Sequence, residues 1–177
     1  MSIDYFVERS TGTWRSMRSA HSLAFRQFED VLSEIQIQPL SIDDDAVIEC
    51  LAAHSLSTGK ISKPFQMKWQ AESDWEPDDP TSVAQGSCIL IPIPDSHRTG
   101  KLLRSKGYAE SESALSTYSF LDDDTFTLKT IYGQSIAEER IWFLSEHVRC
   151  RSSVLRTSEG SGILQTSFCS EIRRISV

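Results

Sequence analysis

Side chains alternate between apolar and polar along much of this chain, a period of two that is typical of β-strands with one buried face. Between residues 33 and 38, Ile35 and Ile37 fall on one side and the intervening polar residues fall on the other. Phe65, Met67 and Trp69 alternate with polar neighbours in the same way. Together with a first strand over 14–21, the pattern predicts further strands at about 83–93, 100–110, 114–120, 125–132, 137–145, 148–157 and 163–174, separated by turn-forming residues.

A short helix is predicted before the first strand. Ser2 is suited to cap its start, and Gly12 is suited to end it. Between these two residues, Ile3, Phe6 and Val7 recur at the i, i+3, i+4 spacing of one helix face.

A second short helix is predicted after residue 44. Ser41 and Asp44 form a variant of the capping box, and the acidic run over residues 43–45 suits the positive end of a helix dipole. The apolar face expected for this helix consists of Val47, Ile48, Leu51 and Ala52.

About ten short strands joined by tight turns must protect their sheet edges, and closure into a barrel is the simplest way to do so. We therefore predict an all-β fold, a single antiparallel β-barrel domain over residues 1–177 with two short helices. The segment Gly12-Thr13-Trp14 is similar to the GxW start of lipocalin barrels. That resemblance implies a barrel like those of lipocalins and fatty-acid-binding proteins, in which Trp14 plugs the closed end and Arg173 or Arg174 stacks over it.

Composition excludes several classes of protein. A formal net charge of −7 on 177 residues disfavours general nucleic-acid binding, because neutralising phosphates needs a basic surface. No run of residues is long and apolar enough to cross a bilayer, and the first residues lack the basic and apolar regions of a signal peptide. The four cysteines, Cys50, Cys88, Cys150 and Cys169, lack the spacing of a metal site, so no metal site is expected. We predict that they are buried or half-buried thiols in a reducing compartment.

Charged residues occupy alternate positions on the last two predicted strands. Arg149, Arg151 and Ser153 share one face of strand 148–157. The corresponding face of strand 163–174 consists of Ser167, Cys169, Glu171 and Arg173. These faces either lie in solvent, as on many antiparallel sheets, or point into the barrel. The second alternative is costly unless the charges are paired with each other or with a ligand.

A linear tetrapyrrole has the chemistry that the inward alternative needs. Its propionates match the guanidinium groups of Arg149 and Arg151, and its pyrrole N–H groups match the carboxylate of Glu171. Its conjugated plane suits a wall of thioether and aromatic side chains, which Met67 and Trp69 would supply. The residue types are consistent with such a ligand, but their spacing alone leaves both alternatives open.

Segments spread over nearly the whole chain resemble the S-type phycobiliprotein chromophore lyases, the CpcS/CpeS family of bilin lyases. Similar segments begin at residues 14–23 and continue, in the order of the family, through 33–35, 67–69, 86–95 and 107–110. The most similar segments are Glu139-Arg140-Ile141-Trp142-Phe143, Arg149-Cys150-Arg151-Ser152-Ser153-Val154 and Ser167-Phe168-Cys169-Ser170-Glu171-Ile172-Arg173.

The resemblance implies an enzyme that attaches a phycobilin, such as phycoerythrobilin or phycocyanobilin, to a phycobiliprotein cysteine through a thioether bond. The bilin is then a substrate, and no permanent cofactor is implied. Glu171 and Arg149 are implied as catalytic residues. The ligand-binding positions that it implies are Met67, Trp69, Trp75, Glu139, Arg149, Arg151, Ser153 and Glu171.

The resemblance also implies partners and a location. The acceptor would be an apo-phycobiliprotein subunit of the phycoerythrin or phycocyanin type, with the β subunit expected, and the lyase would pair as a homodimer. It would act in the cytoplasm of a cyanobacterium or in the plastid stroma of an alga, without membrane insertion.

Two other functions stay open on the sequence. A bilin carrier without transferase activity would use the same pocket. A fatty-acid carrier would place its carboxylate on the arginine pair, although Glu171 would then lie awkwardly beside an alkyl chain. The chain departs from the usual family pattern at Met17, Ala20 and residues 145–147, so its bilin preference stays open as well.

Overall fold

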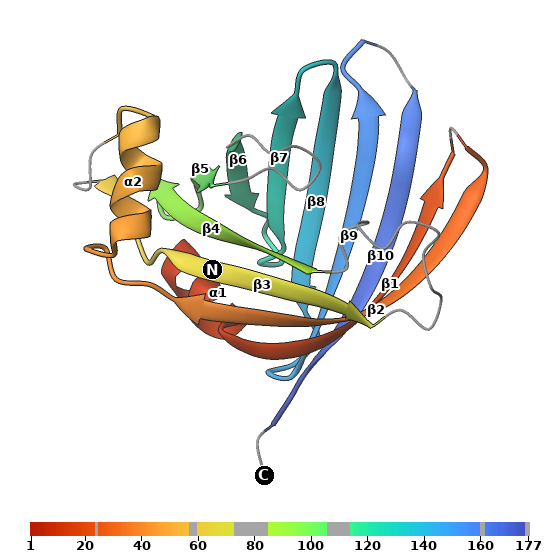
Figure 1. Cartoon of the computed structure of the whole chain (residues 1–177), viewed down its shortest axis with the longest axis horizontal. Helices are drawn as coiled ribbons and strands as arrows, with labels where there is room; N and C mark the ends of the chain where they lie inside the picture. The colour runs from red at the N-terminus through yellow and green to blue at the C-terminus, as the bar shows by residue number, and fades with distance from the viewer. Residues whose placement is uncertain (24, 57–59, 73–84, 106–113, 160–161, 176–177) are drawn as a thin grey trace.

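The computed structural model of the chain describes residues 1–23, 25–56, 60–72, 85–105, 114–159 and 162–175. Within these residues, ten antiparallel strands pair in chain order, and the first strand also pairs with the last, so that the sheet closes into a barrel (Figure 1). Closure gives each strand two neighbours and removes the exposed sheet edges. The predicted all-β, lipocalin-like barrel with two short helices is confirmed.

The barrel consists of β1 (Gly12–Ser22), β2 (Gln27–Pro39), β3 (Phe65–Glu72), β4 (Gln85–Pro94), β5 (Thr99–Arg104), β6 (Ala114–Phe120), β7 (Phe126–Tyr132), β8 (Ser135–Phe143), β9 (Val148–Thr157) and β10 (Ile163–Arg173). Two predicted strand bounds were wrong. β2 begins at Gln27 rather than at residue 33, because its pairing with β1 continues through residues 27–32, where apolar and polar side chains do not alternate. β5 ends at Arg104 rather than at residue 110, and residues 106–113 lie outside the described part of the chain.

Helix α1 (Ile3–Ser10) precedes the first strand, as predicted. The Ser2 side chain caps it by accepting a hydrogen bond from the Tyr5 backbone N–H. The helix ends at Ser10, earlier than predicted, and Gly12 is already the first residue of β1. Gly12 has a φ of +125°, and a Cβ there would lie 2.8 Å from Nη1 of Arg173. Gly12 therefore serves the sharp change of direction from helix to strand.

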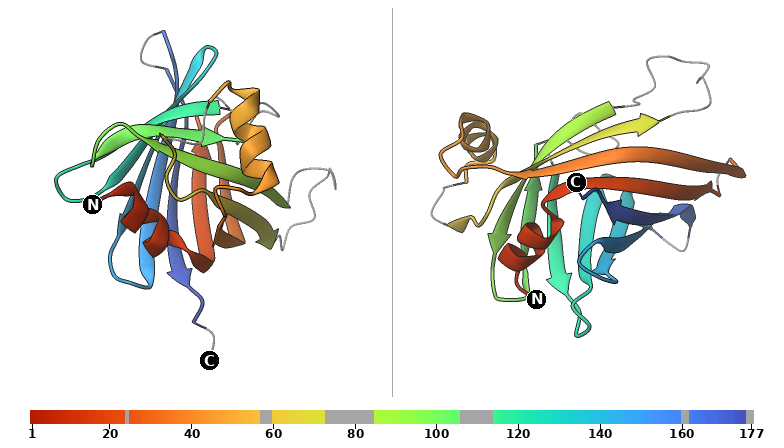
Figure 2. Two further views of the ribbon diagram at one scale, coloured as in Figure 1. Left: turned by 90° about the vertical axis from the view of Figure 1, so that its left-hand side faces the viewer. Right: turned by 90° about the horizontal axis from the view of Figure 1, so that it is seen from below.

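Helix α1 closes one end of the barrel. Its Phe6 ring stacks on Phe126 of β7 at a centroid distance of 4.3 Å, within a buried cluster that includes Trp14. The amino group of Met1 pairs with Asp124 in the turn between β6 and β7, which fixes the start of the helix against that end (Figure 2). The described hydrophobic core thus lies between α1 and the inward faces of the strands.

Helix α2 (Asp45–Ala53) lies outside the barrel, beside β4 (Figure 1). Asp44 caps it by accepting a hydrogen bond of 3.0 Å from the backbone N–H of Ala46. A small cluster buries the helix against the outer face of β4 and β5, and its buried members are Val47, Leu51, Ile91 and Leu103. Neither helix among the described residues is long and apolar enough to span a membrane.

The predicted apolar face of α2 was right for two of its four residues and wrong for the other two. Val47 and Leu51 are buried, but Ile48 is 45% exposed and Ala52 is exposed too. The helix touches the barrel along the single i, i+4 ridge formed by Val47 and Leu51, so the adjacent residues of the apolar face stay in solvent.

This difference between neighbouring residues gives a test of the packing. Leu51→Ala should lower the free energy of unfolding by about 2–4 kcal/mol, because a cavity opens between α2 and the barrel. Ile48→Ala, on the same helix, should change it by less than about 0.5 kcal/mol. Urea denaturation followed by circular dichroism measures both values, and equal losses would contradict the observed orientation of α2.

Candidate functional site

Charged side chains meet on the inward faces of β8, β9 and β10. In the strand register, Arg149 on β9 lies opposite Glu171 on β10, and Ser153 on β9 lies opposite Glu139 on β8. Directly opposed residues on neighbouring strands share a face, so all four side chains point to the interior. Arg149 is 4% exposed and Glu171 is 1% exposed. The alternative in which these faces lie in solvent is therefore wrong.

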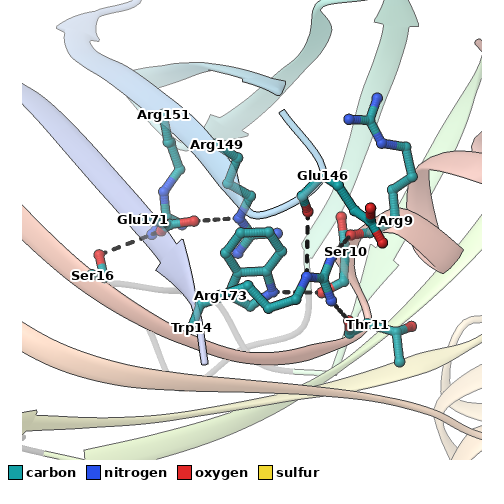
Figure 3. Close-up of polar contacts among 10 residues, drawn as sticks. All are labelled: Arg9, Ser10, Thr11, Trp14, Ser16, Glu146, Arg149, Arg151, Glu171 and Arg173. Carbon is teal, nitrogen blue, oxygen red and sulfur yellow. Dashed lines mark hydrogen bonds and ion pairs between the residues drawn. The ribbon is translucent and has the colours of Figure 1, made fainter. Parts of the chain in front are cut away.

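Glu171 is the centre of this cluster (Figure 3). Its Oε2 accepts a hydrogen bond from Nε of Arg149, and its Oε1 accepts one of 3.0 Å from Nη2 of Arg151. The Ser16 hydroxyl on β1 donates to the same Oε1 at 3.4 Å. Residues of three adjacent strands thus converge on one buried carboxylate.

Two opposing effects act on the pKa of Glu171. Burial raises it, since the charged form loses its water, whereas the positive charges of Arg151 and Arg149 and their hydrogen bonds lower it. The arginines prevail, and the pKa lies below its ordinary value of 4.5. Glu171 is therefore a carboxylate at neutral pH.

Trp14 connects this cluster to the closed end of the barrel. Its ring is fully buried, and the guanidinium carbons of Arg149 and Arg173 lie 4.4 and 4.3 Å from the ring centroid. Its Nε1 donates a hydrogen bond of 2.8 Å to the carbonyl of Ser10, the last residue of α1. The sequence left two candidates for the arginine that stacks on this tryptophan, and the structure identifies Arg173. Arg174 instead pairs with Glu34.

A second buried ion pair joins Glu139 of β8 to Arg104 of β5. Nη2 of Arg104 lies 2.7 Å from Oε2 of Glu139. Burial raises the pKa of Glu139, but Arg104 and Arg151 lower it more, so this carboxylate is also ionised at neutral pH. The sequence alternative that paired Glu139 with its neighbour Arg140 was wrong, because the two side chains point to opposite faces of β8.

Sequence reasoning did not find Arg104. A signal was present, because the alternation of strand 100–110 places Arg104 on the same face as Leu102, which is buried in the barrel core. With Arg104 included, opposite charges alternate across the interior in the order Arg104, Glu139, Arg151, Glu171 and Arg149. This set of side chains, which we call the charged array, carries three positive and two negative charges.

Met67 and Trp69 of β3 lie beside the core as half-buried side chains. Gly86 on β4 makes room for the Trp69 indole, since a Cβ at Gly86 would lie 2.2 Å from its ring. On β9, the hydroxyl of Ser153 is 2.7 Å from that of Ser167 on β10. Trp75, the remaining predicted site residue, lies outside the described residues.

Three of the four thiols, those of Cys50, Cys88 and Cys150, are poor nucleophiles at neutral pH. All four cysteines are free, and three are buried while Cys50 is half-buried, as predicted. Burial raises the pKa of Cys88 to about 11 and also raises the pKa of Cys50 and Cys150. Within the described ranges, no three His, Cys, Asp or Glu side chains lie together in a way that would hold a metal ion.

A closed antiparallel barrel with a helix across one end and a stacked tryptophan beneath it defines a lipocalin-like protein. The family model described as CpeS-like protein matches residues 2–174, nearly the whole of this barrel. The chain belongs to the CpeS-like family.

Named relatives agree with this family. A protein of Trichodesmium erythraeum named chromophore lyase CpcS/CpeS 3 is 47% identical over 175 residues, covering 98% of this chain and 99% of that one. A protein of Microchaete diplosiphon, provisionally named phycoerythrobilin lyase CpeS, is 43% identical over 179 residues, covering 99% of this chain and 79% of that one. The structure of the S-type phycobiliprotein lyase from Guillardia theta is similar with a TM-score of 0.85 at 37% identity, over 100% of this chain and 95% of that one.

The ionised state of Glu171 predicts how its contribution to stability depends on pH. Its pKa is lower in the folded chain than in the unfolded one, so the contribution is present above the ordinary value of 4.5 and is lost as the pH falls through the folded-state pKa. Glu171→Gln should lower the free energy of unfolding by about 3–5 kcal/mol at neutral pH, because it leaves buried arginines without their carboxylate. The difference in the free energy of unfolding between this variant and the unmodified chain should narrow as the pH falls below 4.5 and through the folded-state pKa.

Glu138→Gln is a matched control, since Glu138 lies on the same barrel but forms an exposed pair with Arg156. Its effect should stay below about 1 kcal/mol at neutral pH. Urea denaturation at several pH values measures both variants. A Glu171→Gln effect as small as that of Glu138→Gln would show that the buried carboxylate does not stabilise the barrel.

Proposed function

We propose that this chain binds a phycobilin inside the barrel and attaches it through a thioether bond to a cysteine of a phycobiliprotein subunit. The observation that supports this most directly is the charged array, which carries a net positive charge in the interior of a barrel whose relatives are named chromophore lyases. A linear tetrapyrrole carries carboxylates for the arginines and N–H groups for the carboxylates.

The charged array offers the ligand accessible groups of both signs. Glu139 retains 20% of its side-chain surface, whereas Glu171 retains 1%. The side chain of Arg151 is 19% exposed, whereas that of Arg149 is 5% exposed. Met67 and Trp69 would flank the conjugated plane, and the Ser153 hydroxyl would offer a further hydrogen bond.

Both carboxylates favour a protonated tetrapyrrole, because each is ionised and a nearby negative charge stabilises a cation. Protonation makes the exocyclic double bond of ring A more electrophilic. The acceptor thiolate then forms a C–S bond at the exocyclic carbon, the electrons of the double bond shift into the ring system, and the adjacent ring carbon takes up a proton. Arg149 and Glu171 act here by fixing the charges that hold the bilin in one orientation.

The finer assignments follow from the relatives. A 43% identical relative bears the name of a phycoerythrobilin lyase, so we propose phycoerythrobilin as the bilin, with phycocyanobilin as the alternative substrate. The acceptor is proposed to be the β subunit of a phycoerythrin or phycocyanin, in the cytoplasm of a cyanobacterium or the stroma of a plastid. No permanent cofactor takes part in this scheme.

A homodimer is part of the proposal. Outward-facing apolar side chains adjoin one another on β8, β10 and β1, and the Trp142 and Phe168 rings lie 6.1 Å apart on that face. Met17 and Ile172 extend the same outer face and are exposed. Adjoining exposed apolar side chains of this kind are typical of protein interfaces.

Phe168→Lys is therefore expected to convert a dimer into a monomer at micromolar concentration, because a charge would be buried at the interface. Ile131→Lys introduces the same charge at an exposed position on β7 and should leave the dimer intact. Sedimentation velocity measures the mass of each variant. A monomeric unmodified chain, or a dimer that persists in Phe168→Lys, would contradict this interface.

The transfer assay tests the proposed function itself. The purified chain and phycoerythrobilin are mixed with the apo α subunit in one reaction and with the apo β subunit in another. The bilin adduct on each subunit is measured by mass spectrometry after denaturation. A lyase gives a stoichiometric bilin adduct at one acceptor cysteine. A change of bilin colour without an adduct would identify a carrier, and no colour change would favour a lipid carrier.

Glu171→Gln should reduce the rate of transfer at least about tenfold and shift the absorption of the bound bilin, because the charge that favours the protonated pigment is lost. Glu138→Gln serves again as the control and should behave like the unmodified chain. Circular dichroism verifies that each variant is folded under the assay conditions. A folded Glu171→Gln variant with unchanged rate and spectrum would exclude the proposed role of this carboxylate.

A further inference from the structure

Arg104 is a buried cation with an incomplete set of hydrogen bonds. It is 8% exposed, and its Nη2 is paired with Glu139. Its Nε is buried as well, and it has no hydrogen-bond partner among the described residues. Leaving a buried donor of a charged group unpaired is unfavourable, so such an atom points to a partner that arrives from outside the chain.

The position of Arg104 places this donor in the barrel interior. Strands β5 and β8 are not neighbours, because β6 and β7 lie between them in the sheet. Arg104 and Glu139 therefore reach each other only because both side chains point inward, across the faces of the two intervening strands.

The need to neutralise Glu139 does not by itself explain why a second arginine, Arg104, is buried here. The guanidinium of Arg151 already acts on both Glu139 and Glu171 and lowers the pKa of each. With Arg104 added, the charged array has one more positive than negative charge. Cys88, which lies near Arg104, supplies no compensating anion because its thiol is neutral at pH 7.

Arg149, by contrast, is engaged by two groups of the chain itself. It is hydrogen-bonded to Glu171, and its guanidinium lies over the Trp14 ring at the closed end of the barrel. The buried guanidinium Nε that lacks a described partner thus belongs to Arg104 and not to Arg149, which the sequence had favoured as a carboxylate ligand.

We propose that Arg104 is an anchor for a carboxylate of the bound tetrapyrrole, with Arg151 as the anchor for the other. This inference rests on the proposed function, and it names Arg104 and not Arg149 as the second ligand of the propionates. Glu139 then lies between the two anchors and keeps them apart. The incoming carboxylate completes the hydrogen bonds of Arg104 and neutralises the surplus charge of the array.

The experiment compares phycoerythrobilin with its dimethyl ester, which has the same chromophore but no carboxylates. Absorption titrations give the dissociation constant of each for the unmodified chain and for Arg104→Gln. Esterification should weaken binding to the unmodified chain by about 100-fold or more, because two charge-assisted hydrogen-bonded contacts are lost. In Arg104→Gln this factor should fall by about tenfold, since free bilin loses one anchor while the ester loses none.

Arg140→Gln is the matched control. Arg140 neighbours Glu139 on β8 but lies on the outer face and is exposed, so its removal should leave the esterification factor unchanged. Glu139→Gln separates the two roles of Arg104. It removes the ion pair but keeps Arg104, so the esterification factor should be at least as large as in the unmodified chain, because Arg104 no longer shares its donors with Glu139. A factor that falls as far as in Arg104→Gln would contradict direct binding by Arg104.

If Arg104→Gln fails to fold, the double variant Arg104→Gln/Glu139→Gln takes its place. It removes both charges of the pair, so that no unpaired charge stays buried. The same tenfold fall is expected there. An esterification factor that stays at the value of the unmodified chain in either Arg104 variant would overturn the proposal while leaving bilin binding in place. An unmodified chain that binds neither compound would overturn the proposed function and this inference with it.

Discussion

The whole structure depends on one buried carboxylate held between two guanidinium groups. Glu171 would be too costly to ionise in the interior if Arg149 and Arg151 did not face it from the adjacent strand. Its third partner, Ser16, lies on β1, the strand that closes the barrel by pairing with β10. Glu171 therefore has all of its partners only when the barrel is closed and in the correct register, because a slip of one residue would turn it to the outer face.

The same network joins the site to the closed end of the barrel. Arg149 contacts both Glu171 and the Trp14 ring. Arg173 lies over that ring and donates hydrogen bonds to the carbonyls of Thr11 and Arg9, at the C-terminal end of α1, where a positive charge is favoured. Charge, aromatic ring and helix end therefore form one continuous support, which holds the inward arginines in place before any ligand arrives. Preorganised charges of this kind need no rearrangement when they meet a charged ligand.

The period-two pattern was sufficient for the barrel, because burial of one strand face is a local property that each segment reveals by itself. It was also sufficient to place Arg149, Arg151 and Glu171 on common faces. It was not sufficient to show which face was inside, or that Arg104 would pair with Glu139, since that contact joins two strands that are separated by β6 and β7. The length of β2 and the exposure of Ile48 were missed for a related reason: both are decided by the element packed alongside, and not by the local sequence.

The surplus positive charge is what distinguishes this interior from a self-contained ion-pair network. A barrel that needed the charges only for stability would balance them, because an uncompensated buried cation is destabilising. Arg104 lies at the far end of the array from Arg149, and its buried Nε lacks a partner among the described residues. The arrangement is rigid where α1 closes the barrel and electrostatically incomplete at β5. An anionic ligand would therefore be oriented by the array along its length, with its carboxylates drawn to Arg151 and Arg104.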